Sequence, residues 1–155
     1  MQPIVGYNFG AQKIDRVKQT LKLGIVSGVV ITSSGFFICE LFPHAVSAIF
    51  TDSDHLIDLA VDGLRITVIM FPFVGAQIVI GNFFQSIGKA KISIFLSLTR
   101  QLLYLLPCLL LFPNWWGLKG IWISMPVSDA LAFITAVISL IIYIKKVSKQ
   151  HLIAE

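Results

Sequence analysis

Residues 66–88 read ITVIMFPFVGAQIVIGNFFQSIG, a run of 23 residues that contains no charged side chain. A helix needs about 20 apolar residues to cross the hydrocarbon core of a bilayer. Three other stretches of the 155-residue chain have a similar length, namely 23–42, 92–112 and 121–144, and each contains one charged residue. The sequence therefore predicts an all-α membrane protein with four transmembrane helices, in a single membrane domain over residues 1–155.

The composition agrees with four spans and argues against other classes of protein. Apolar residues make up 56% of the chain and charged residues 13%, whereas soluble domains carry about 25% charged residues and disordered chains are far less hydrophobic. The net charge is +4. In so apolar a chain, an excess of basic residues is more typical of a protein whose loops set its orientation in the membrane than of a protein that binds nucleic acid. Cys39 and Cys108 lie inside apolar runs, and their spacing predicts neither a metal site nor a disulfide framework.

Lysine and arginine residues in the loops predict the orientation in the membrane. Nine of them lie before the first span, between the second and third, or after the fourth, and only Arg65 and Lys119 lie on the other side. Since cytoplasmic loops are enriched in these residues, both termini should be cytoplasmic, with residues 145–155 as a cytoplasmic tail. The outer side carries three tryptophans at the expected headgroup level: Trp115, Trp116 and Trp122.

Residues 1–22 are predicted to form a cytoplasmic loop that leads into a short interfacial helix over residues 11–22. In this helix Ile14, Val17 and Leu21 share one face, and the basic residues lie elsewhere. A short amphipathic helix with a basic polar face is typical of a segment that lies on the membrane surface.

A second short helix is predicted over residues 54–64, and it can run directly into the second span. Its three aspartates, Asp54, Asp58 and Asp62, repeat every four residues. The spacing permits a cation site, but it is more typical of a solvated acidic face near a helix N-terminus, where the helix dipole favours negative charge. No metal site is therefore predicted.

Polar side chains within the spans are informative, because an ionisable group in a bilayer costs roughly 2.5–3.5 kcal/mol on insertion scales. In the second span, Gln77, Gly81, Gln85 and Gly88 follow at spacings of four, four and three, so they share a helix face. Such a face either packs closely on a neighbouring helix or lines a cavity, and the sequence leaves both open. Pro72, inside this span, predicts a kink.

Gln77 lies about 16 Å into the second span at 1.5 Å per residue, near the midplane of a bilayer core of about 30 Å. An amide at that depth meets no water unless a cavity supplies it. We therefore predict that Gln77, with Phe73 and Phe84, faces or flanks a substrate cavity. Structural roles are expected for other polar residues of the spans: Asn82, Gln85, Arg100, Gln101 and Asp129.

Arg100 and Asp129 raise the question of an ion pair between the third and fourth spans. Arg100 lies about 12 Å from the cytoplasmic end of its span, and Asp129 lies about 22 Å from the cytoplasmic end of its own. The two side chains would meet only if the arginine side chain were extended or if one helix were strongly tilted. Each residue could instead meet a partner on a helix outside the chain.

Several strings stand in order along the chain: QPIVGYNFGA at 2–11 with Arg16, NFFQSIGKAK at 82–91, Arg100 and Gln101 with Pro107, GLKGIW at 117–122, and PVSD at 126–129. Together they resemble the multidrug and toxic compound extrusion (MATE) family of membrane transporters. The first resembles the cytoplasmic loop that opens the third helix of the family's C-terminal lobe. The others resemble the turn between its tenth and eleventh helices, its eleventh helix, and the start of its twelfth.

The resemblance implies a twelve-helix transporter, with two six-helix lobes around a central cavity, of which this chain would supply helices nine to twelve. The chain would then be a C-terminal fragment or truncated reading frame that forms one wall of the cavity. Some branches of the family have a cation-coupling carboxylate in helix ten, but the corresponding stretch here, FVGAQ at 73–77, has none. In branches that lack it, coupling is expected through acids of the N-terminal lobe.

The function implied by the resemblance is part of a secondary antiporter that exports drugs or amphipathic metabolites in exchange for sodium or protons by alternating access. Its expected partners are the lipid bilayer, a drug-like small molecule, the coupling ion and the missing N-terminal helices, in a bacterial inner membrane. The sequence has no nucleophile–base pairing and no phosphate-binding glycine loop, so neither an enzyme nor a cofactor is expected. Two alternatives stay open: a lipid-linked glycan flippase of similar architecture, and a stand-alone four-helix membrane scaffold.

Overall fold

The computed structural model describes the backbone of residues 1–154 and the side-chain surroundings of residues 1–147. The secondary structure of this part of the chain is entirely helical. In chain order the elements are α1 (Gln2–Gly10), α2 (Ile14–Leu41), α3 (Pro43–Ala48), α4 (Asp54–Thr67), the 3-10 turn η1 (Val68–Met70), α5 (Phe71–Ser86), α6 (Ala90–Leu98), the π-helical segment η2 (Thr99–Leu105), α7 (Leu106–Trp116) and α8 (Leu118–Ala154).

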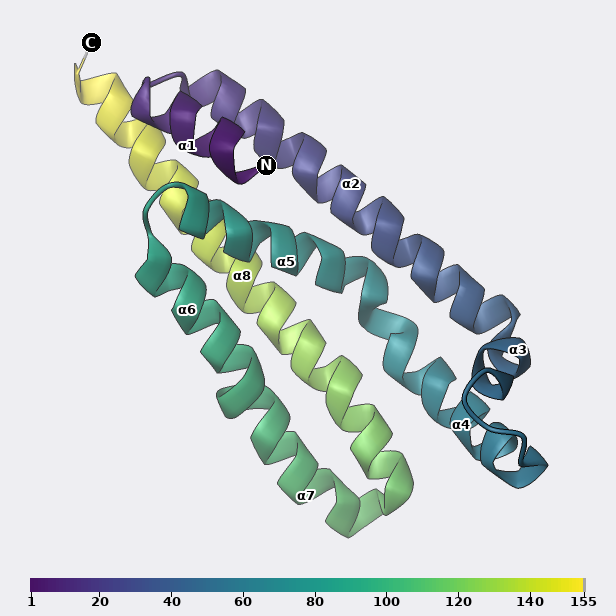
Figure 1. Ribbon diagram of the computed structural model, residues 1–155. Coiled ribbons are helices and arrows are strands. Elements are labelled where there is room, and N and C mark those ends of the chain that lie inside the picture. Colours follow the sequence, from purple (N-terminus) through teal and green to yellow (C-terminus); the bar gives the residue numbers. More distant parts are fainter. Residues whose placement is uncertain (155) are drawn as a thin grey trace.

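Four continuous helical stretches are long and apolar enough to cross a membrane: Ile14–Leu41, Asp54–Ser86, Ala90–Trp116 and Leu118–Val147. Figure 1 shows them packed side by side, with both termini at the end of the molecule where α1 lies. Gly88 and Gly117 make the tight turns into α6 and α8 with φ of +75° and +55°, a backbone region that favours glycine. The predicted fold class, an all-α protein with four candidate membrane spans, is confirmed.

The N-terminal segment differs from the sequence prediction in two ways. Residues 2–10, predicted as a loop, form α1, and residues 11–22 do not form a separate interfacial helix. Instead, Gln12 turns the chain with φ of +57°, and Ile14 begins a helix that continues without a break to Leu41. The apolar face that suggested a surface helix is buried against the rest of the bundle, through Val17 and Leu21.

The second span is bent where α4 passes into α5, as Figure 1 shows. The 3-10 turn η1 separates the two helices, and Pro72 lies in the first turn of α5. Proline has no backbone N–H to donate to the preceding turn, and its ring clashes with the carbonyl there, so the α-helix does not continue straight through it. The predicted kink at Pro72 is therefore present.

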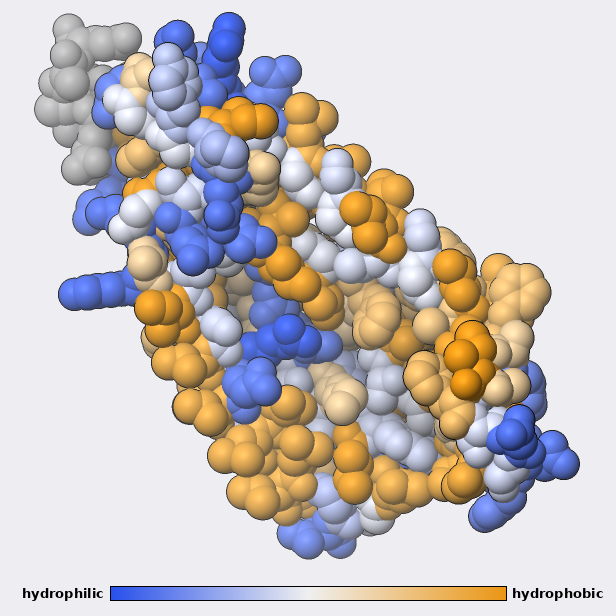
Figure 2. Space-filling view, in the orientation of Figure 1, coloured by the Kyte–Doolittle hydropathy of each residue, from blue (hydrophilic) through white to orange (hydrophobic). Residues whose placement is uncertain are grey.

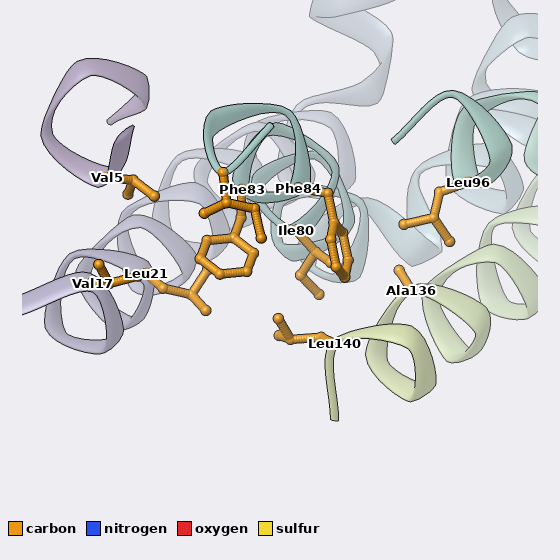
Figure 3. Close-up of a cluster of buried hydrophobic side chains, with 10 residues drawn as sticks. Val5, Val17, Leu21, Ile80, Phe83, Phe84, Leu96, Ala136 and Leu140 are labelled. Atoms are coloured by element: carbon orange, nitrogen blue, oxygen red, sulfur yellow. The ribbon is translucent and has the colours of Figure 1, made fainter. Parts of the chain in front are cut away.

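The hydrophobic core lies at the end of the bundle that carries the termini (Figure 3). It joins side chains from α1, α2, α5, α6 and α8 with the loop residue Ile87: Val5, Val17, Leu21, Ile80, Phe83, Phe84, Ile87, Leu96, Ala136 and Leu140. Val5 and Phe84 have no exposed surface. The contacts of α1 with α5 include a hydrogen bond from Gln2 Nε2 to Gln85 Oε1 at 3.1 Å. Two of the family-like strings, 2–11 and 82–91, are thus packed against each other.

The helices α2 and α5 approach each other closely. A Cβ atom added to Gly75 would clash with the Gly28 carbonyl oxygen and lie 2.5 Å from Thr32 Oγ1. Thr32 already donates its hydroxyl hydrogen to that same carbonyl at 2.9 Å. Small residues that let two backbones come together are a common basis of helix packing in membranes, and here Gly28 and Gly75 fill that role.

Candidate functional site

Gln77 lies on the face of α5 that packs against α8. Two phenylalanines of that face mark the packing. The rings of Phe73 and Phe133 are tilted against each other with centroids 5.2 Å apart, and the centroids of Phe84 and Tyr143 are 5.5 Å apart. Gln77 follows Phe73 by four residues and precedes Phe84 by seven, so all three side chains share the face. Gln77 is buried on this face, with only 8% of the residue exposed.

The side-chain carbonyl oxygen of Gln77 has no hydrogen-bond partner among the described residues, and it is the one buried side-chain polar atom there of which this is true. Leaving such a group unpaired costs about 1–3 kcal/mol, and the bilayer core supplies no water to satisfy it. In this structure the oxygen is enclosed, with less than 1 Å² of exposed surface, so a bound molecule or another helix can pair with it only after the side chain or α5 moves.

The other two predicted site residues lie in different surroundings. Phe73 is 46% exposed, so part of its ring is available to a ligand or a further helix. Phe84 has no exposed surface and packs in the core against Phe83 and Tyr143. Phe84 therefore cannot touch a substrate directly in this structure. The sequence placed Phe84 beside the cavity but did not indicate that it is buried against Tyr143 of α8.

The polar residues expected to have structural roles are distributed over several environments. Gln85 is exposed and accepts a hydrogen bond from Gln2 of α1. The backbone carbonyl of Asn82 accepts a hydrogen bond from the Ser86 hydroxyl at 2.6 Å, and Asn82 itself is half-buried. Gln101 is exposed on η2. Of these residues, Gln85 has the clearest structural contact, since it ties α1 to α5.

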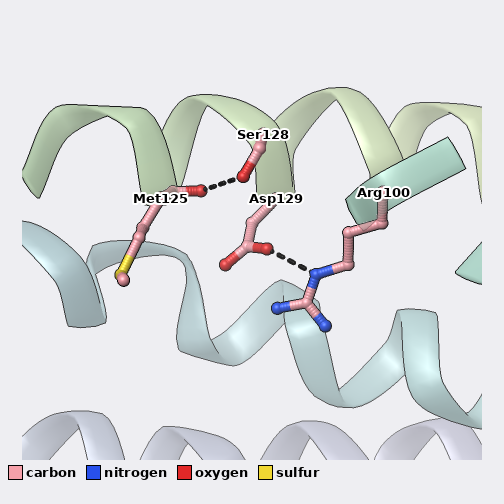
Figure 4. A network of polar contacts seen from close by, with 4 residues as sticks. All are labelled: Arg100, Met125, Ser128 and Asp129. Atoms are coloured by element: carbon pink, nitrogen blue, oxygen red, sulfur yellow. Dashed lines mark hydrogen bonds and ion pairs between the residues drawn. The ribbon is translucent and has the colours of Figure 1, made fainter. Parts of the chain in front are cut away.

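Arg100 and Asp129 form an ion pair in the structure (Figure 4). Arg100 Nε donates to Asp129 Oδ1 at 2.8 Å, and the Asp129 side chain is only 9% exposed while that of Arg100 is 36% exposed. The different depths expected for the two residues in their spans therefore do not prevent the pair. The long arginine side chain closes the difference in depth between the two residues.

A second polar contact joins the same two helices. Tyr104 of η2 and Thr135 of α8 have their hydroxyl oxygens 2.8 Å apart. The Thr135 hydroxyl donates its single hydrogen to the Leu131 carbonyl at 2.8 Å, so Tyr104 is the donor to Thr135. Arg100 and Tyr104 both belong to the π-helical segment, a winding often found at functional positions in helices. Two side-chain contacts thus fix the register of η2 against α8.

The acidic side chains of the described residues are not gathered into a metal site. No group of three or more His, Cys, Asp or Glu residues in that part of the chain could hold a metal ion. The row of Asp54, Asp58 and Asp62 on α4 is exposed, as a solvated acidic face would be. Glu40 lies 3.9 Å from Arg65 in a partly exposed pair between α2 and α4.

Comparison with known proteins gives matches over most of the chain. A family model described as MatE matches residues 1–110. The multidrug export protein MepA of Staphylococcus haemolyticus (strain JCSC1435) is 24% identical over 129 residues, which are 83% of this chain and 28% of that protein.

Solved structures of transporters have the same fold. An inward-facing multidrug resistance MATE family transporter of the MOP superfamily matches with a TM-score of 0.89 at 20% identity, over 96% of this chain and 35% of that one. The outward-facing conformation of such a transporter matches with a TM-score of 0.88 at 20% identity, over 96% and 34%.

The chain spans about a third of the length of these relatives. Its four membrane-length helices form the same arrangement as part of the transporter structures, and the family match covers more than half of the chain. This chain is an integral membrane protein and belongs to the MATE family of multidrug transporters, which are not enzymes.

Proposed function

We propose that this chain forms one side of the substrate pathway in a secondary antiporter that exports drugs or amphipathic metabolites by alternating access. The observation that carries the proposal is the match of the same four-helix unit to both an inward-facing and an outward-facing transporter. A unit that fits both states keeps its internal shape, as expected where one bundle rocks against another. The relative named as a multidrug export protein supports the drug-like class of substrate.

The coupling ion, sodium or a proton, is proposed to bind outside this chain. Asp129 is the one acid deep in the described spans, and Arg100 neutralises it. Residues 73–77 contain no carboxylate, and Glu40 is a half-buried residue beside Arg65. These positions support coupling through acids of additional N-terminal helices, which we propose as the partner of this unit.

Ethidium export tests the proposed activity. Cells that express only these 155 residues are expected to export no more ethidium than vector controls, because one wall of a cavity cannot alternate its access. When the chain is completed with the eight helices proposed to precede it, export should appear and should fall when the sodium and proton gradients are collapsed. Export by the 155 residues alone would contradict the proposal, and so would export that persists without either gradient.

Within this chain, we propose that substrate contacts Gln77 and Phe73. The exposed part of the Phe73 ring supports this choice, and so does the unpaired Gln77 oxygen, which is enclosed in this structure and would gain a partner once α5 moves or the side chain rotates. An amide acceptor beside an aromatic ring suits an amphipathic cation, which needs both a polar contact and an apolar surface. Phe84 is proposed to flank the site from within the core by holding α5 against α8.

Replacing Gln77 by methionine separates a binding role from a packing role. Methionine is similar in shape and has no amide, so removing an unpaired buried oxygen should leave membrane abundance unchanged or raised. In the completed transporter, we expect Gln77→Met to change resistance to some drugs by at least about threefold and to leave others unaltered. The measurement is a growth assay over chemically distinct drugs, with abundance followed by immunoblot.

Gln101→Met serves as the control, because Gln101 is an exposed amide on a neighbouring membrane-length helix. A large fall in the abundance of Gln77→Met would assign Gln77 to packing against a further helix. An unchanged resistance profile at normal abundance would remove Gln77 from the site.

Both termini are proposed to be cytoplasmic, on the strength of the lysine and arginine distribution. A C-terminal fluorescent tag that folds only in the cytoplasm should be bright, and a cysteine placed at Ser53 should react with a membrane-impermeant maleimide added outside. The endogenous Cys39 and Cys108 are first replaced by alanine. A dark tag together with a protected residue 53 would reverse the orientation.

A further inference from the structure

An open groove of about 960 Å³ lies at the end of the bundle that carries the termini. It is bounded by the turn between α1 and α2, the turn between α5 and α6, and the last described turns of α8. Its volume is at the upper end of the range for pockets that hold drug-sized ligands. None of the residues considered for the substrate site, Gln77, Phe73 or Phe84, lines it.

The charged side chains of this groove all carry the same sign. Lys89 and Lys91 come from the turn into α6 and Lys146 comes from α8, and no acidic residue lies among the described lining residues. Ser139 and Tyr143 add hydroxyl groups from α8. The N-terminus of α6, which begins at Ala90, adds the positive end of a helix dipole to the same rim. The groove therefore favours an anionic group with several oxygen atoms.

The remaining walls are apolar and continue onto the outside of the bundle. Ile92, Phe95 and Ile142 line the groove, and Phe95 and Ile142 are 57% and 62% exposed. Figure 2 shows hydrophilic residues gathered at the terminal end of the molecule and a hydrophobic surface along α6 and α7. An occupant can thus place a charged group among the lysines and a hydrocarbon chain along α6 and α8.

The groove also lies at the right depth for a membrane lipid. Lys89 and Lys91 flank Ala90, the first residue of the third span, and Lys146 follows the apolar run of α8 that ends at Ile144. The lysine nitrogens are therefore close to the level where the hydrocarbon core gives way to phosphate headgroups. Basic pockets between transmembrane helices at this level bind anionic headgroups.

We propose that this groove is a binding site for an anionic phospholipid, with the headgroup phosphate between Lys91 and Lys146 and the acyl chains along Phe95 and Ile142. The charge excludes the cationic compounds proposed as substrates. The apolar walls favour a lipid over free phosphate, because they would remain uncovered by an inorganic ion. The proposal holds for either orientation in the membrane, since it concerns the leaflet that this end of the bundle meets.

Native mass spectrometry of the purified chain tests the proposal. The chain is released from detergent micelles that contain equal amounts of phosphatidylglycerol and phosphatidylcholine with identical acyl chains. We expect one phosphatidylglycerol to be retained per chain, with a preference over phosphatidylcholine of at least about tenfold, because each lysine near an anionic surface strengthens binding roughly fivefold. The double variant Lys91→Gln/Lys146→Gln should lose that preference and keep its circular dichroism spectrum.

A matched variant, Lys22→Gln/Lys145→Gln, controls for net charge. Both lysines are exposed near the same membrane surface, and neither lines the groove. This variant should retain the preference, and soluble glycerol phosphate at millimolar concentration should not displace the lipid. Equal retention of the two lipids by the wild type would overturn the proposal. So would an equal loss in both double variants, or displacement by glycerol phosphate, which would assign the groove to a soluble phosphate compound.

Discussion

Replacing Arg100 by leucine is expected to lower the free energy of unfolding by about 3 kcal/mol, because it leaves the Asp129 carboxylate buried without its counter-charge. Removing one partner of a buried ion pair costs roughly 3–5 kcal/mol, and the lower end applies because the Arg100 side chain is 36% exposed. The measurement is the unfolding midpoint of the purified chain in mixed micelles of increasing denaturing detergent, followed by circular dichroism.

Two further variants make the origin of that loss clear. The double variant Arg100→Leu/Asp129→Asn removes both charges and should recover most of the stability, since the cost lies in the unpaired carboxylate. Gln101→Leu changes the adjacent residue, which is exposed, and should shift stability by no more than about 0.5 kcal/mol. If the double variant is as unstable as Arg100→Leu, the arginine contributes through its packing and not through the charge of Asp129.

The second large effect is expected at Gly75, where a single added methyl group should destabilise the chain by about 1–3 kcal/mol. In Gly75→Ala the new Cβ would meet the Gly28 carbonyl oxygen and Thr32 Oγ1. The first of these belongs to the α2 backbone, so it can move only if α2 and α5 separate. The same detergent titration measures the loss, and a cross-link between α2 and α5 should form less readily.

Gly81→Ala is the matched control on the same helix. A Cβ there would lie 4.0 Å from Ser93 Oγ, an ordinary contact distance. Alanine is favoured over glycine within a helix by roughly 0.5–1 kcal/mol, so Gly81→Ala should be neutral or slightly stabilising. Equal destabilisation by the two substitutions would show that the close approach at Gly75 has no special role.

The four spans could be predicted because hydrophobic length is a local property of the sequence. The kink at Pro72 was predictable for the same reason, since the missing N–H belongs to one residue. The ion pair of Arg100 and Asp129 could not be predicted, because it depends on the register of two antiparallel helices along their common axis. The Tyr104–Thr135 contact fixes that register, and nothing in either helix alone specifies it.

The sequence also does not predict the burial of side chains that pack against distant segments of the chain. Phe73, Gln77 and Phe84 were predicted to face or flank a cavity, but the spacing does not say which of them pack against α8, because that is a matter of tertiary packing. Similarly, α1 contains Gly6 and Gly10, which weaken a helix in isolation. It is helical because Val5 is buried in the core and Gln2 bonds to Gln85.

The docking of α1 on α5 has a consequence for biogenesis. The two residues of the Gln2–Gln85 hydrogen bond are 83 positions apart, so this contact cannot form until the second span has been synthesised. At about 5–20 residues per second, the delay is roughly 4–17 s. A nine-residue helix is too short to be stable alone in water. The α1 segment therefore leaves the ribosome without this contact and becomes helical only as a late step, after the span that carries Gln85 has been synthesised.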